Sequence, residues 1–169
     1  MQAARPYCIR MMTAVRAMAG IAAALVAIAG CGSSAFTIAN ASVDASYSCP
    51  VGSNNAPYDL HATADADNAT SQGVDLRSVS AVMVVADVHG VWQQAVGSEY
   101  DAGQVQFSPT TVGASAKAKL QVTIPSACSN GTHKGVADDY GDYTVKLTIV
   151  TSAGTFKLTS QNKHRILAA

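Results

Sequence analysis

Most of this chain alternates apolar and polar residues one by one, and that period limits what it can fold into. The alternation is clearest over residues 117–124 and 143–149, where apolar side chains alternate with Lys, Gln or Thr. In a β-strand, every second side chain points to the same face of the sheet. Both segments are therefore predicted to be half-buried antiparallel strands.

Other segments extend the same pattern. Residues 43–49 and 58–64 also alternate, and residues 79–88 are nearly continuously apolar and rich in Val, as expected of a strand packed centrally or buried on both faces. Ser152-Ala153-Gly154 predicts a turn that joins residues 143–149 to a last strand over 156–160. No segment after residue 31 keeps a helical period. We therefore predict an all-β, antiparallel sandwich of about seven strands over residues 42–169.

The first thirty residues have the pattern of an export signal. Arg5, Arg10 and Arg16 precede or border an uncharged run over residues 17–29, and no acidic residue occurs before Asp44. As a helix this run would be about 20 Å long, which is shorter than the roughly 30 Å hydrocarbon layer of a membrane. A cleaved signal is therefore expected rather than a membrane-spanning anchor.

The end of this signal carries a more specific motif. Ile28-Ala29-Gly30-Cys31 resembles the lipobox of bacterial lipoproteins. The resemblance implies cleavage before Cys31, a diacylglyceryl group on its thiol, and often acylation of its new amino end. Two or three acyl chains hold a protein on a membrane, whereas one binds only marginally. Residues 1–30 are then a lipoprotein signal, and residues 31–41, which are small, polar and unpatterned, are the lipidated Cys and a flexible tether.

This motif implies a location and a first partner. The mature protein is expected on the extracytoplasmic face of a bacterial cell membrane, with the membrane as its partner through Cys31. The alternative is an ordinary secretory signal cut elsewhere, with Cys31 incidental. Translation could also begin at Met11 or Met12 without changing the lipobox.

Charge excludes one class of partner. Three of the 11 basic residues lie within residues 1–30 and none of the 11 acidic ones does, so the mature chain carries 8 basic against 11 acidic groups, a net charge of −3. This balance does not suit binding to a nucleic-acid backbone. Eight acids and one base lie in residues 44–101, and three acids and seven bases follow. We expect the two halves to pair on the surface of the sandwich; the alternative is an acidic binding face.

Cysteine usage predicts one disulfide. Cys8 leaves with the signal and Cys31 is lipidated, so Cys49 and Cys128 remain. In an exported protein such a pair is expected to be oxidised, and closing a loop of about 80 residues stabilises the fold by about 4 kcal/mol. The alternative of a metal or redox pair lacks C-x-x-C spacing and nearby His.

One stretch resembles a known family of domains. Residues 139–145, Asp-Tyr-Gly-Asp-Tyr-Thr-Val, resemble the tyrosine corner before strand F of immunoglobulin-like domains, and their continuation resembles the last hairpin of bacterial PKD-type and fibronectin-like modules. The resemblance implies that the Tyr143 ring fills the edge of the core while its hydroxyl bonds to backbone. Val145 stands where antibody-type domains have Cys. The disulfide is therefore expected to join an N-terminal strand to the loop before strand F, without a B-to-F bridge between sheets, and Trp92 lacks its usual Cys partner.

No catalytic signature is present. The mature chain has no G-x-S-x-G, H-E-x-x-H or phosphate-binding Gly loop, so we expect no enzyme and no cofactor. A non-catalytic cell-envelope module that binds an unknown protein or envelope ligand is the favoured hypothesis. Its predicted contact residues are Trp92, Tyr100 and Phe107, which lie among glutamines. Alternatively, Trp92 fills the core.

Two other classes of function stay open. Divalent metal could bind His61 with Asp65 or Asp67, which share one strand face, although a solvated face is the simpler interpretation. A second acidic cluster comprises Asp138, Asp139 and Asp142, where a structural turn is expected. No metal site is therefore assigned. The last alternative is an enzyme whose site is assembled from distant loops.

Overall fold

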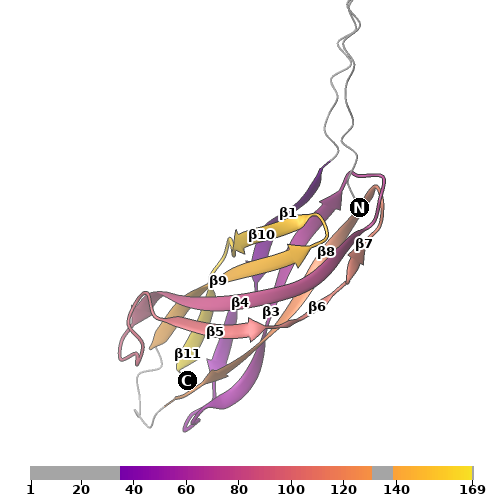
Figure 1. Ribbon diagram of the computed structural model, residues 1–169. Coiled ribbons are helices and arrows are strands. Elements are labelled where there is room, and N and C mark those ends of the chain that lie inside the picture. The colour runs from indigo at the N-terminus through magenta and orange to yellow at the C-terminus, as the bar shows by residue number, and fades with distance from the viewer. Residues whose placement is uncertain (1–34, 131–138, 169) are drawn as a thin grey trace, which may run out of the picture. The chain divides into compact units, whose positions relative to one another are not determined.

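The chain folds into two β-sheets that pack face to face (Figure 1). The computed structural model describes residues 35–130 and 139–168, so Cys31 and Asp138 lie outside the described residues. The strands in chain order are β1 (Phe36–Val43), β2 (Ser46–Cys49), β3 (Ala56–Asn68), β4 (Val74–His89), β5 (Glu99–Gln104), β6 (Gln106–Ser108), β7 (Thr111–Val112), β8 (Ala116–Cys128), β9 (Tyr140–Thr151), β10 (Gly154–Thr159) and β11 (His164–Ala168). In this part of the chain, no helix is long and apolar enough to cross a membrane.

The strand order is that of an immunoglobulin-like sandwich. One sheet has the order β1-β3-β8-β6, and the other has the order β2-β11-β9-β4-β5. β10 and β11 pair with successive parts of β9 and so act as two halves of one strand. With that equivalence, the sheets read A-B-E-D and A′-G-F-C-C′ in immunoglobulin nomenclature. The predicted all-β sandwich is confirmed, and only the pairing of β2 with β11 is parallel among the described strands.

The strand count and one boundary differ from the prediction. The described residues form eleven strands instead of about seven, because the N-terminal strand changes sheet between Val43 and Ser46, the last strand is interrupted, and the short strands β5, β6 and β7 are additional. The predicted tether over residues 31–41 is wrong from Phe36 onward. Phe36, Ile38 and Ala41 are buried beneath the small polar residues of β1. The sandwich therefore begins before residue 42.

The core lies between the inward faces of the two sheets and follows the predicted alternation. Leu60 of β3, Leu120 and Ile124 of β8, and Val145 and Ile149 of β9 are all fully buried. The intervening positions of these strands are exposed or half-buried, except Asp142 of β9, which is buried. β4 lies centrally, between β9 and β5, as its apolar sequence predicts. Burying one such aliphatic side chain contributes about 1.5–3 kcal/mol, so this alternation supplies the main driving force for the fold.

The disulfide between Cys49 and Cys128 is present. It joins the last residue of β2 to the last residue of β8, so Cys128 ends a strand rather than lying in the following loop. Because β2 and β8 belong to different sheets, the bond connects the two layers. The sandwich thus has an inter-sheet bridge, between strands other than B and F.

Different strands begin and finish at the two ends of the sandwich. At the N-terminal end, Phe36 begins β1 opposite Asn68, the last residue of β3. At the far end, β2, β4 and β8 finish and β3 and β9 begin, with the disulfide between the sheets. β3 has 13 residues, so the two ends lie about 40 Å apart along it. In Figure 1 the β4–β5 loop and the β9–β10 turn mark opposite ends.

Candidate functional site

The three predicted contact residues do not form one exposed surface. Tyr100 on β5 is 45% exposed, and its hydroxyl lies 3.4 Å from the carbonyl oxygen of Pro125 in the other sheet. Trp92 and Phe107 are half-buried and pack against the core, Phe107 opposite Val122. The prediction of a shared surface is therefore corrected, because two of the three side chains point inward.

Trp92 closes the far end of the core. Its indole N–H donates to the Tyr143 hydroxyl over 3.2 Å, and that hydroxyl donates to the side-chain oxygen of Gln94. Gly141 leaves the space for the indole: a Cβ there would lie 2.5 Å from the Trp92 ring. Trp92 therefore packs against the core, as the alternative interpretation of the sequence predicts. The prediction that the Tyr143 hydroxyl bonds to backbone is corrected, because its hydrogen bonds in the described residues are to the side chains of Trp92 and Gln94.

The far end also carries exposed apolar residues. Val91 and Val96, in the β4–β5 loop, are 64% and 59% exposed, and Val51, directly after β2, is 74% exposed. Together with Tyr100 they are the large exposed apolar side chains within residues 35–130 and 139–168. We call these four residues the far-end apolar set. Sequence reasoning missed the three valines, although each is next to a Gly, which is a loop signal.

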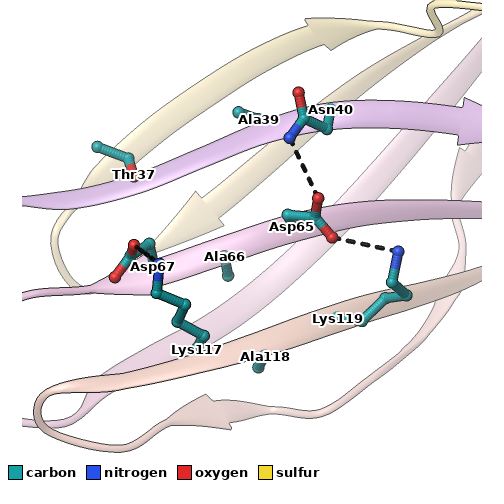
Figure 2. A pocket seen from close by; sticks show the side chains of 9 residues that line it. All are labelled: Thr37, Ala39, Asn40, Asp65, Ala66, Asp67, Lys117, Ala118 and Lys119. Atoms are coloured by element: carbon teal, nitrogen blue, oxygen red, sulfur yellow. Dashed lines mark hydrogen bonds and ion pairs between the residues drawn. The ribbon is translucent and has the colours of Figure 1, made fainter.

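A polar hollow lies on the outer face of the A-B-E-D sheet, toward its N-terminal end (Figure 2). Its volume is about 470 Å³, and it is lined by short side chains of β1 and by charged side chains of β3 and β8. The lining residues are Thr37, Ala39, Asn40, Asp65, Ala66, Asp67, Lys117, Ala118 and Lys119. Two cross-strand rows produce this arrangement, each with a small residue on β1, an Asp on β3 and a Lys on β8.

The charges of the hollow satisfy one another. Lys119 lies 3.2 Å from Asp65 and Lys117 lies 2.8 Å from Asp67, while the Asn40 amide donates to Asp65 over 3.1 Å. The hydrogen bonds from Asn40 and Lys119 hold the pKa of Asp65 below its usual value, and the bond to Asp67 raises the pKa of Lys117. The hollow could accept a small polar ligand, although its charged side chains already have partners within it.

The side chains predicted as alternative metal ligands contact other side chains instead of one another. His61 does share the outer face of β3 with Asp65 and Asp67, but its Nδ1 lies 3.0 Å from Asp44. Asp142 accepts two hydrogen bonds from Arg165, at 2.7 and 2.9 Å, and these bonds lower its pKa. Within the described residues, no three His, Cys, Asp or Glu side chains gather as metal ligands.

The predicted pairing of the two charge halves is visible in the ion pairs. Asp65, Asp67 and Glu99 come from the acidic half of the sequence, and their partners Lys119, Lys117 and Lys146 come from the basic half. Each pair is exposed, so each contributes little to the stability of the fold. Their main consequence is that the charge asymmetry of the sequence is reduced locally on the folded surface.

Comparisons with known proteins give remote likenesses of fold. No protein-family model matches the chain, and no curated protein sequence matches it. Among solved structures it is similar to the ASH/PapD-like domain 7 of human CEP192, with 14% identity, coverage of 95% of this chain and 96% of that one, and a TM-score of 0.37. A putative late embryogenesis abundant protein has 17% identity, coverages of 78% and 71%, and a TM-score of 0.43.

A third likeness is to Spo0M, a sporulation control protein from Bacillus subtilis. It has 10% identity and a TM-score of 0.37, with 80% of this chain and 50% of that one covered. The immunoglobulin-like assignment rests on the strand order, and these likenesses carry no information about function.

Proposed function

We propose that this protein is a bacterial cell-envelope lipoprotein, anchored through Cys31, that binds a partner non-catalytically through its far end. The observation that carries the binding role is the position of the far-end apolar set. Val51, Val91, Val96 and Tyr100 lie at the end opposite Phe36, where the chain from the anchor enters the fold. The two ends of the sandwich lie about 40 Å apart along β3.

The proposed contact between the far-end apolar set and its partner is mainly apolar. Isolated exposed apolar residues are common on protein surfaces, so the support for a contact is that these four lie toward one end of the sandwich and that two of them share the β4–β5 loop. The disulfide fixes the end of β2, directly before Val51, and Trp92 packs the β4–β5 loop against the core, which gives both loops a firm base. A firm base favours binding because less conformational freedom is lost when the partner docks.

The anchor has a direct test. In the bacterium, Cys31→Ser removes the acceptor thiol, and we expect the protein to move from the detergent phase to the aqueous phase in a phase-separation experiment. Wild-type protein should remain in the detergent phase, since two or more acyl chains dominate its partitioning. Unchanged partitioning of the Ser variant would reject lipid anchoring at this residue.

The contact has an independent test. We expect the double variant Val91→Ser/Val96→Ser to lose a partner complex that wild-type protein keeps when it is solubilised in mild detergent and sedimented. Both side chains are largely exposed, so the stability of the fold should change by less than about 1 kcal/mol. The matched control is Ala153→Ser/Thr155→Ser, at exposed positions of the β9–β10 hairpin at the other end. Equal sedimentation of the two double variants would contradict the far-end contact.

A further inference from the structure

The outer face of the A′-G-F-C-C′ sheet carries little charge at its centre. β4 and β9 are its central strands here, and β5 and β10 border them (Figure 1). In residues 78–84 of β4 and 144–150 of β9, buried core residues alternate with residues that point outward. The outward residues are Ser78, Ser80, Val82, Val84, Thr144, Lys146, Thr148 and Val150. Lys146 is charged, and the other seven are half-buried.

The centre of the other outer face is charged instead. Asp59, Asp65 and Asp67 on β3 and Lys117 and Lys119 on β8 point outward there. Depletion of charge is typical of the buried centre of a protein interface. Most of the uncharged outward residues of β4 and β9 are Val or Thr, whose β-branched side chains have few rotamers to lose. This face can therefore be covered at a small cost in conformational entropy.

The two borders of this face carry opposite charges. On β5, Glu99 and Asp101 lie opposite outward-facing valines of β4, so their side chains share the face. On β10, Lys157 lies opposite an outward-facing threonine of β9. In the described part of the chain, neither Asp101 nor Lys157 has an ion-pair partner. One border thus offers a carboxylate, and the other an ammonium group, for contact with a second molecule.

We propose that this face is the interface between two copies of the chain, related by a twofold axis that runs between β4 and β9 and parallel to them. Rotation about this axis lays the acidic β5 of each copy over the basic β10 of the other, and β4 over β9. Asp101 then lies over Thr159 of the other copy, two residues from Lys157. Two residues along a strand are about 7 Å, a distance that a lysine side chain spans. A twofold axis across the strands would instead lay β5 over β5 and bring acids together.

The size and charge balance of the face suit this arrangement. The face is about 19 Å wide over four strands and about 40 Å long over the 12 residues of β9, so it offers up to about 750 Å² per copy. Specific interfaces bury about 800 Å² per partner. Lys146 is paired with Glu99 of its own copy over 2.9 Å, so association leaves no central cation unpaired.

The same axis suits two anchored copies. Because it runs parallel to the strands, the N-terminal ends of both copies point in the same direction, as two anchors in one membrane require. This step rests on the proposed anchor, whereas the charge and size arguments do not. Anchoring also confines the copies to one layer, which raises their effective concentration and lets a weak interface form. The dimer goes beyond the far-end contact and would present two far ends side by side.

Photo-cross-linking of the full chain in isolated bacterial membranes tests the interface. A photoreactive amino acid is placed at Gln104 or Thr159, which are exposed border positions of the face, or at Gln121, which is exposed on the outer face of the other sheet. We expect an adduct of twice the mass of the chain from positions 104 and 159, with at least about fivefold lower yield from position 121. Equal yields at the three positions, or adducts of any other mass in place of the dimer, would overturn the proposal. Because phase partitioning of the protein tests the anchor separately, an anchored protein that gives no dimer rejects the interface alone.

Charge variants test the axis. With the photoreactive residue at position 104, Lys157→Glu places a carboxylate near Asp101 of the other copy, so we expect the dimer yield to fall several-fold, and Lys157→Gln should give an intermediate yield. Adding Asp101→Lys to Lys157→Glu restores opposite charges between the copies and should restore the yield, whereas the control Lys119→Glu, on the other sheet, should leave it unchanged. If the double variant does not fold, the graded series at position 157 carries the test. Insensitivity to Lys157→Glu, an equal loss with Lys119→Glu, or a folded double variant that is not restored would contradict the proposed axis.

Discussion

Replacing both Cys49 and Cys128 by Ala should lower the free energy of unfolding by about 4 kcal/mol. The bond closes a loop with a sequence separation of 79, and its loss restores the conformational freedom of that loop to the unfolded chain. It also releases the last residues of β2 and β8, which belong to different sheets. Urea denaturation of the full chain, followed by circular dichroism, measures the change.

The cysteine variant has a matched comparison. Wild-type protein reduced and held under a thiol reductant should lose most of the stability that the double Ala variant loses, because both lack the cross-link and the variant lacks only the two buried sulfur atoms in addition. Both sulfur atoms are buried, so reduction should require prior unfolding or strong denaturant. A difference between oxidised and Ala-substituted protein below about 1 kcal/mol would show that the bond does not constrain the unfolded chain.

Trp92→Ala should lower the free energy of unfolding by about 3 kcal/mol, at the lower end of the range for a buried Trp because this ring is half-buried. The substitution empties the space over Gly141 and removes the indole donor from the Tyr143 hydroxyl. In wild-type protein, Gly141→Ala should cost about 1–3 kcal/mol, since its methyl group would collide with the indole. Urea denaturation of each variant measures these effects.

The double variant tests the contact itself. Once Trp92 is Ala, the added methyl group of Gly141→Ala meets no ring, so the second substitution should cost less than about 0.5 kcal/mol. Ala153→Ser, in the exposed β9–β10 turn, is the control substitution and should leave the stability unchanged within about 0.5 kcal/mol. Fully additive effects of Trp92→Ala and Gly141→Ala would mean that the indole does not occupy this space.

The strands that sequence reasoning located best are those with strong contrast between neighbours. Lys117 to Ile124 alternates long polar with aliphatic side chains, and its burial alternates accordingly. The sequence of β1 predicts a tether because Thr37, Ala39 and Asn40 are small or polar and interrupt the apolar pattern of the buried Phe36 and Ile38. The place where the chain leaves one sheet for the other depends on tertiary pairing, which a local pattern does not contain.

The candidate site was harder to predict because contact between distant segments decides which aromatic residues are exposed. Trp92 turns inward because position 141 is Gly, and Phe107 turns inward because β6 pairs beside Val122. Neither relation can be derived from neighbouring residues. The remaining exposed side chains, Val91 and Val96, carry no special chemistry that would distinguish them from core valines in the sequence.

Site-specific photo-crosslinking in the intact cell envelope tests the central proposal most directly. A photoreactive amino acid is placed at Val91 or Val96 at the far end, and at Ala153 as an exposed control near the other end. We predict one discrete adduct from both far-end positions and none of that mass from position 153. Equal labelling from both ends, or no adduct at the far end while position 153 gives one, would contradict binding through the far end.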